Sequence, residues 1–318
     1  MALACGGPTK PPPESESNQP ISPAKADDSV PRSHVSQTRT RLRLDVSPYG
    51  PSLVLLGSRP ALVTADALHW LDGDGSLPVP LTSGEQGGMG GTSLTRWSAG
   101  VLRRFDPARA GWAVLGRMPR APRLVVDAGD GVAWLRQNEP NAGVSLWALV
   151  GSEPRRVAAV SGDIGAMTLR DDRLFFVEEL PGSSWRLGVV ATSGDGPRYA
   201  EPVRGRTPAM LAVTSDVFYY DGPTLSVYRV STDLKRTEQV GKDVICSPFA
   251  VAASIYCSQP GGLLELPLAG GPARVLVPSQ GTVTAMLATD SQLFWLREAP
   301  RGGLAVESMS LSRSAAPR

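Results

Sequence analysis

The chain has 318 residues, of which 42% are hydrophobic and 19% charged, and its formal net charge is +2. This length allows one large β domain or two ordinary domains, while a nearly neutral charge argues against nucleic acid or an anionic membrane face as partner. The 34 glycines and 29 prolines favour many short strands joined by turns. No apolar run reaches the roughly 18 residues that would predict a transmembrane helix.

The N-terminus reads Ala-Leu-Ala-Cys-Gly over residues 2–6, and a tract rich in proline and serine follows. Small residues before a cysteine resemble the end of a bacterial lipoprotein signal peptide, although Ala2 stands where leucine is commoner and no basic or long apolar region precedes it. The resemblance implies that residues 1–5 are the remnant of the signal, that Cys5 is lipidated, and that the protein is exported to the periplasm or outer membrane. An ordinary cysteine in a disordered tail is the alternative.

Residues 6–38 contain few apolar side chains and are predicted to form a disordered tether. From residue 39 to residue 312, short β-type runs alternate with Gly, Pro, Asp and Ser, and residues 313–318 are predicted to be a disordered tail. No segment of a dozen residues shows a helical apolar period. The folded part is therefore predicted to be all-β.

A strand–turn–strand unit that ends on a large aromatic residue recurs along the chain, as in TADALHW (64–70) and TDSQLFW (289–295), and in residues 251–257 Tyr256 and Cys257 stand at the aromatic end. The spacings between the anchors that end these units are 64, 42, 44, 37 and 38 residues. The anchors are Trp70, Trp134, Phe176, Tyr220, Cys257 and Trp295. A period near 40 residues is typical of a four-stranded propeller blade.

The first interval is too long for one blade and too short for two, so a loop inserted at residues 83–93 is expected within a single blade. Six blades fit the spacing best; seven remain possible if residues 41–57 and 75–123 contain another. The last unit lacks a fourth strand, and the alternating Arg and Leu of residues 39–45 could supply it. Pairing of the N- and C-terminal strands would then close the ring and remove an open edge.

The units resemble six-bladed β-propellers of the YWTD/NHL-like group and the propeller-like lipoproteins of δ-proteobacteria. The segments that carry this resemblance are residues 69–72, 133–135, 219–221, 294–296 and 266–281, although no unit has a complete Tyr-Trp-Thr-Asp. The group contains binding scaffolds and a minority of enzymes, such as lactonases and quinoproteins. The resemblance therefore implies a fold and leaves the function open.

Candidate catalytic or metal-binding residues are few. His34 falls in the tether, and His69 is read as a packed or rim residue, so a zinc or copper site is not expected. Asp72 and Asp74 are spaced like the start of a calcium loop, but the following residues supply no carboxylate. A hairpin turn would also account for these aspartates and the glycines beside them. No cofactor is expected, with calcium as the alternative.

Three other patterns have structural interpretations. One aspartate per repeat is predicted to bond to nearby backbone N–H groups in a turn: Asp66, Asp130, Asp172, Asp216 and Asp290. Cys246 and Cys257 are predicted to form a disulfide across a hairpin if the protein is exported, with two buried thiols as the alternative. The basic stretch is interpreted as solvated strand edges or as a patch for an anionic glycan or acidic protein: Arg103, Arg104, Arg109, Arg117, Arg120 and Arg123.

These observations favour a non-catalytic propeller scaffold that binds a protein or glycan partner at the bacterial cell envelope, attached to the membrane through its lipid alone and not binding nucleic acid. The alternative is a lactonase-like hydrolase with a metal in the central channel. A third possibility is a purely structural part of an envelope complex. No catalytic residue is assigned, because the sequence shows no convergent set of ionisable groups.

Overall fold

The computed structural model describes residues 38–44, 51–64, 66–73, 75–78, 86–90, 93–118, 120–127, 132–138, 143–208, 211–278 and 281–311. Its strands all belong to the compact unit Ser36–Arg318. The signal remnant with Cys5, the tether up to residue 37 and the tail 313–318 lie outside the described residues. Within the described ranges no helix is long and apolar enough to cross a bilayer.

The described strands pair into seven antiparallel sheets, which are called blades 1 to 7 in chain order. Blade 1 comprises β2 (Ser52–Leu56), β3 (Arg59–Val63), β4 (Ala67–Trp70) and β5 (Ser76–Pro78). Blade 2 comprises β6 (Gln86–Gly90), β7 (Ser93–Ser98), β8 (Val101–Asp106) and β9 (Gly111–Arg117). Blade 3 comprises β10 (Leu124–Asp127), β11 (Val132–Asn138), β12 (Val144–Val150) and β13 (Glu153–Val160).

The second half of the unit repeats this arrangement. Blade 4 comprises β14 (Ile164–Arg170), β15 (Arg173–Leu180), β16 (Ser184–Ala191) and two short outer strands, β17 (Arg198–Tyr199) and β18 (Val203–Arg204). Blade 5 comprises β19 (Leu211–Val213), β20 (Val217–Asp221), β21 (Ser226–Val230) and β22 (Thr237–Gly241). Blade 6 comprises β23 (Phe249–Val251), β24 (Ser254–Gln259), β25 (Gly262–Pro267) and β26 (Arg274–Pro278). Blade 7 comprises β27 (Val283–Ala288), β28 (Gln292–Glu298), β29 (Leu304–Ser310) and the N-terminal β1 (Arg39–Leu44).

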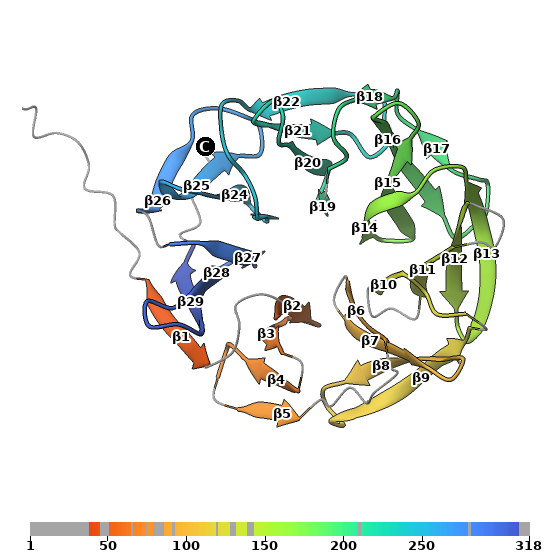
Figure 1. Ribbon diagram of the computed structural model, residues 1–318, viewed down its shortest axis with the longest axis horizontal. Helices are drawn as coiled ribbons and strands as arrows, with labels where there is room; N and C mark the ends of the chain where they lie inside the picture. The colour runs from red at the N-terminus through yellow and green to blue at the C-terminus, as the bar shows by residue number, and fades with distance from the viewer. Residues whose placement is uncertain are drawn as a thin grey trace, which may run out of the picture. The chain divides into compact units, whose positions relative to one another are not determined.

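The first strand of each sheet lies nearest the centre of the ring, as Figure 1 shows for β2, β14 and β27. Each of these inner strands contacts the inner strands of both neighbouring blades, and β27 contacts β2. The contacts therefore close a continuous ring of seven blades. An all-β propeller is confirmed, in the seven-bladed form that the sequence left open.

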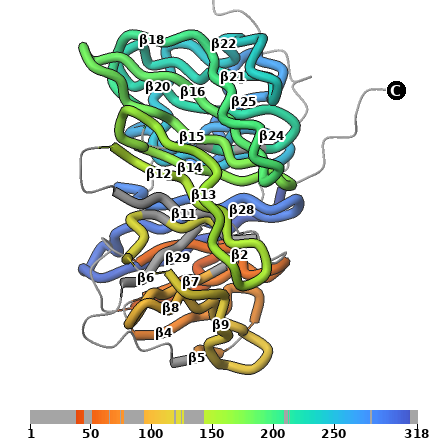
Figure 2. Tube along the Cα trace, turned by 90° about the vertical axis from the view of Figure 1, so that its right-hand side faces the viewer, coloured from red at the N-terminus to blue at the C-terminus, as the bar shows by residue number. Residues whose placement is uncertain are grey.

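The predicted closure by the two chain ends is confirmed. β1 pairs with β29 from Arg39 opposite Ser308 to Leu44 opposite Leu304, and both views show the red end of the described chain beside the blue end (Figures 1 and 2). Leu42 and Leu44 pack against a buried cluster that joins blades 7 and 1. β1 thus contributes both hydrogen bonds and apolar contacts to the closing sheet.

The interval between Trp70 and Trp134 explains why six blades seemed the better fit. Trp70 lies on β4, the third strand of blade 1, whereas the other anchors lie on second strands. The second strand of blade 2 is β7, and its Trp97 precedes Trp134 by 37 residues, a normal period. The expected inserted loop at 83–93 was wrong, because residues 86–90 form a strand of their own, β6.

The apolar core lies between the blades. Phe176 and Trp295, two of the anchors, have no exposed surface, and they pack in the clusters between blades 3 and 4 and between blades 6 and 7. Trp70 is half-buried in the cluster between blades 1 and 2. Opposite faces of each sheet therefore face different neighbours, which is why the strands read as nearly continuous apolar runs.

Candidate functional site

The central channel supplies few groups for chemistry. Its seven described inner strands contain only two residues with ionisable side chains, Asp127 and Arg170. Catalysis by acid, base or metal needs several such groups to converge. Among the described residues, no three His, Cys, Asp or Glu side chains form a group that could hold a metal ion. The described inner strands thus supply few groups for acid–base or metal chemistry.

His69 and Asp72 lie away from the inner strands. His69 is on β4, and burial lowers its pKa against a smaller opposing effect from the charge of Asp66. The Asp72 carboxylate accepts two hydrogen bonds of 2.8 Å from the Arg59 guanidinium, which hold its pKa below the usual range. Arg59 also lies 3.9 Å from the centre of the Trp70 ring. Asp72 is therefore engaged by arginine, while Asp74 lies outside the described residues.

At two of the repeat turns, threonine hydroxyls make the backbone contacts that were predicted for the aspartates. The Oγ1 atoms of Thr64 and Thr289 accept hydrogen bonds from the N–H groups of Ala67 and Gln292, at 3.1 and 3.0 Å. Asp66 accepts a hydrogen bond from the Thr64 hydroxyl. The turn position of Asp66 was right, but its bonding partner was wrong, because the Thr64 hydroxyl accepts from the Ala67 N–H and itself donates to Asp66. Asp130 lies outside the described residues.

Cys246 and Cys257 form the predicted disulfide between the segment after β22 and strand β24. Both side chains are fully buried in the cluster between blades 5 and 6. Because both sulfur atoms are used in this bridge, and neither is exposed, the pair contributes to the structure of the fold and provides no nucleophile.

The basic stretch does not form one patch. Arg103 and Arg104 are neighbours on β8 and so point to opposite faces of the sheet. Arg109 pairs with Asp106 in the next turn, at 3.5 Å. Arg117 ends β9 and is exposed. The interpretation as separate strand edges therefore fits better than a single anionic-ligand patch.

Two buried carboxylates have structural partners. Glu178 is fully buried; its Oε1 accepts hydrogen bonds from Ser161 and Gly162, and its Oε2 accepts one of 2.8 Å from Arg186. Burial would raise the pKa of Glu178, but these hydrogen bonds and the charge of Arg186 together lower it. In blade 7, Glu307 accepts hydrogen bonds from Thr40 and Arg297. Neither carboxylate is open to a ligand.

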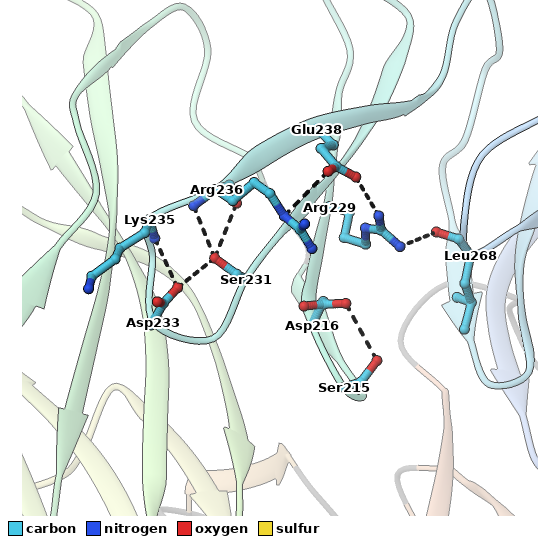
Figure 3. Close-up of polar contacts among 9 residues, drawn as sticks. All are labelled: Ser215, Asp216, Arg229, Ser231, Asp233, Lys235, Arg236, Glu238 and Leu268. Atoms are coloured by element: carbon cyan, nitrogen blue, oxygen red, sulfur yellow. Dashed lines mark hydrogen bonds and ion pairs between the residues drawn. The ribbon is translucent and has the colours of Figure 1, made fainter.

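A second polar network holds the outer hairpin of blade 5 (Figure 3). Asp233 accepts hydrogen bonds from the Ser231 hydroxyl and the Lys235 N–H, which lower its pKa. Arg229 pairs with Glu238 and also donates a hydrogen bond of 3.3 Å to the carbonyl oxygen of Leu268 in blade 6. These groups connect the hairpin to itself and to the next blade.

An open hollow of about 410 Å³ lies at one end of blade 4. Two turns form its rim, the β14–β15 turn and the β16–β17 loop, which lie at the same end because the strands run antiparallel. The residues that line it carry two guanidinium groups, two carboxylates, a hydroxyl and small apolar groups. They are Asp172, Arg173, Val189, Ala191, Ser193, Asp195, Gly196 and Arg198.

Strand register places the apolar and basic groups on one face. Arg173 pairs with Ala191, and Val189 pairs with Arg198, so all four side chains lie on the same side of the sheet. This face packs against blade 5, since Val189 shares a buried cluster with Leu234 of the blade 5 hairpin. The hollow therefore has an apolar floor on β16 and an arginine on the strand to either side.

The β16–β17 loop is held by a hydrogen bond within the loop and by one from blade 3. Ser193 donates a hydrogen bond of 3.2 Å to Asp195, and the Arg155 guanidinium of blade 3 donates one of 3.4 Å to the Ser193 carbonyl oxygen. Gly196 has a positive φ of 81°, a conformation that other residues rarely adopt. These contacts set the position of the Asp195 carboxylate at the rim.

Sequence reasoning missed this hollow. It assigned Asp172 to a repeat turn, and it gave no sign that the outer strand of this blade is divided into β17 and β18. The glycine-rich residues 194–196 just before it were the available signal, because a longer loop there leaves the edge of β16 uncovered.

Solved β-propellers have similar structures. An oligogalacturonate lyase in complex with manganese superposes with a TM-score of 0.61 at 14% identity, over 87% of this chain and 91% of that chain. The fold is a β-propeller. The Cps50 (Swd1) propeller domain of Myceliophteria thermophila gives 0.59 at 10% identity, over 87% and 100%. An oligogalacturonate lyase from Vibrio parahaemolyticus gives 0.58 at 11% identity, over 88% and 98%.

At identities this low, the likeness establishes the fold alone. No family model matches the sequence. No curated protein matches it either.

Proposed function

We propose that the protein is an exported, lipid-anchored propeller that binds a protein or glycan partner at the bacterial cell envelope and catalyses no reaction. The observation that carries the proposal is the distribution of ionisable groups. The inner strands supply two, Asp127 and Arg170, whereas an open hollow with four charged side chains lies at a loop end of blade 4. Loops on a rigid scaffold are the usual site of binding.

The hydrogen bonding of the two buried carboxylates supports the same proposal. Glu178 and Glu307 are held by arginines and hydroxyls inside their own blades, so they stabilise the ring and are not available as general acids or bases. The Cys246–Cys257 disulfide supports export, because disulfides persist in oxidising compartments.

The alternative is a propeller hydrolase with a metal in its channel. A specific observation favours a metal-dependent enzyme, though not hydrolysis in particular, since a similar structure is that of a lyase in complex with manganese. Elemental analysis of the purified protein separates the two functions. Binding without catalysis predicts no stoichiometric metal, and manganese, calcium or zinc bound at one equivalent would refute it.

The lipid anchor has a separate test. The chain is expressed from its own chromosomal gene and labelled with a radioactive fatty acid, as wild type and as Cys5→Ser. We expect label on the wild type and none on the variant. If neither protein carries label, the anchor is wrong while the binding function remains open.

A further inference from the structure

We infer that the hollow on blade 4 binds an acidic sugar, either free or at the end of a glycan, with its carboxylate on Arg198. This inference rests on the proposed binding function and names its ligand class. The hollow combines three chemical features that a sugar acid would use, and each comes from a different part of the blade.

The first feature is a free cation. Arg198 is exposed and has no ion pair or hydrogen bond with any of the described residues, in contrast to the arginines that hold Glu178 and Glu307. Its guanidinium can bind a carboxylate through two parallel hydrogen bonds. Arg173, on the opposite side of β16, is only loosely paired with Asp172, at 3.9 Å.

The second feature is a set of acceptors at the rim. Asp172 and Asp195 come from two different turns, and both carboxylates are exposed. Ionised carboxylates accept hydrogen bonds from hydroxyl groups. A simple anion would be repelled by two carboxylates, whereas a sugar acid presents hydroxyls to them and its own carboxylate to arginine.

The third feature is the floor. Ala191 is partly exposed and offers a small apolar contact between the two arginines, which suits the C–H face of a pyranose ring, while Val189 beneath it is buried against blade 5. The volume of about 410 Å³ lies at the lower end of the range of ligand pockets, about 300–1,000 Å³. The hollow is therefore suited to one or two sugar units and too small for a folded partner.

The test is a titration of the full-length protein with D-glucuronate, D-glucose and acetate, followed by ligand-observed NMR. Glucuronate and glucose differ only in the carboxylate, and acetate supplies a carboxylate without hydroxyls. We expect saturable binding of glucuronate at least tenfold tighter than that of either other probe. Acetate binding as tightly as glucuronate, or glucose binding as tightly, would overturn the assignment.

Two variants locate the site. Arg198→Gln is expected to weaken glucuronate binding at least tenfold, and Arg198→Lys to weaken it less, because lysine keeps the charge but loses the planar fork. Arg204→Gln on β18 removes an exposed arginine from the same edge outside the hollow and is the matched control. Equal binding by Arg198→Gln and the wild type would place the sugar elsewhere and overturn the inference.

The same samples distinguish failure of this inference from failure of the proposed function. Conversion of glucuronate to a new product, or one equivalent of bound metal, would overturn the non-catalytic function. Absence of glucuronate binding, with no product and no metal, would overturn only the acidic-sugar assignment.

Discussion

Replacing Cys246 and Cys257 together with alanine measures what the disulfide contributes to the ring. The two residues are 11 apart in the sequence. Closing a loop of that length in the unfolded chain gives a stabilisation of about 2.8 kcal/mol at 25 °C. Loss of two buried sulfur atoms from the cluster between blades 5 and 6 adds a packing cost.

Urea unfolding with and without reductant separates these two contributions. Without reductant, the double variant should be less stable than the wild type by about 2.8 kcal/mol plus the packing cost. With reductant, only the packing cost should remain. The difference in unfolding free energy between wild type and variant should therefore decrease when reductant is added, and the size of this decrease is the contribution of the disulfide.

Thiol counting provides the control. The chain has three cysteines, so unfolded, unlipidated wild type should titrate one thiol if the bridge is formed and three if it is not. A bridge contribution below about 0.5 kcal/mol, with one titratable thiol, would refute the loop-entropy reasoning.

Three further predictions concern other parts of the fold. Glu178→Gln should lower the free energy of unfolding by about 2 kcal/mol at pH 7, since it weakens charged hydrogen bonds to a buried group. Because the pKa of Glu178 is lowered from 4.5 in the folded state, this difference should shrink as pH falls below that value in acid-to-neutral urea titrations; a gap independent of pH would contradict it. Deleting residues 1–44, which removes β1, should abolish cooperative thermal unfolding, whereas deleting residues 1–35 should leave the melting temperature unchanged. Asp72→Asn should lower the free energy of unfolding by less than about 1 kcal/mol, because the ion pair with Arg59 is exposed. If calcium raises the melting temperature of the wild type but not of this variant, Asp72 is a calcium ligand instead.

The sequence predicted the blade repeat well because second strands such as β15, β24 and β28 are buried on both faces. Phe176 and Trp295 recur at blade spacing because both positions fill the space between neighbouring sheets. Trp70 was misplaced for an equally physical reason. The turn at Thr64 joins the second and third strands, while the turn at Thr289 joins the first and second, yet both use the same hydroxyl contact. Turn chemistry alone cannot tell which strand of a blade follows.

The hollow could not be predicted in the same way. Arg173 and Arg198 are 25 residues apart, and only strand register places both beside the short apolar side chains of β16. A shift of one residue in either pairing would turn an arginine to the opposite face. Local sequence patterns carry no information on strand register, so they could not predict the hollow. They did predict the Cys246–Cys257 pair, because a hairpin brings those two positions together.

The pairing of β1 with β29 also has a consequence for the order of folding. The hydrogen bond between Thr40 and Glu307 joins residues that are 267 positions apart. Contacts between such distant positions are slow to form, because the loop entropy must be lost before the contact stabilises anything. β1 therefore has no partner until β29, the last of the described strands, has been synthesised. The ring can be completed only after every other strand of the propeller has been made.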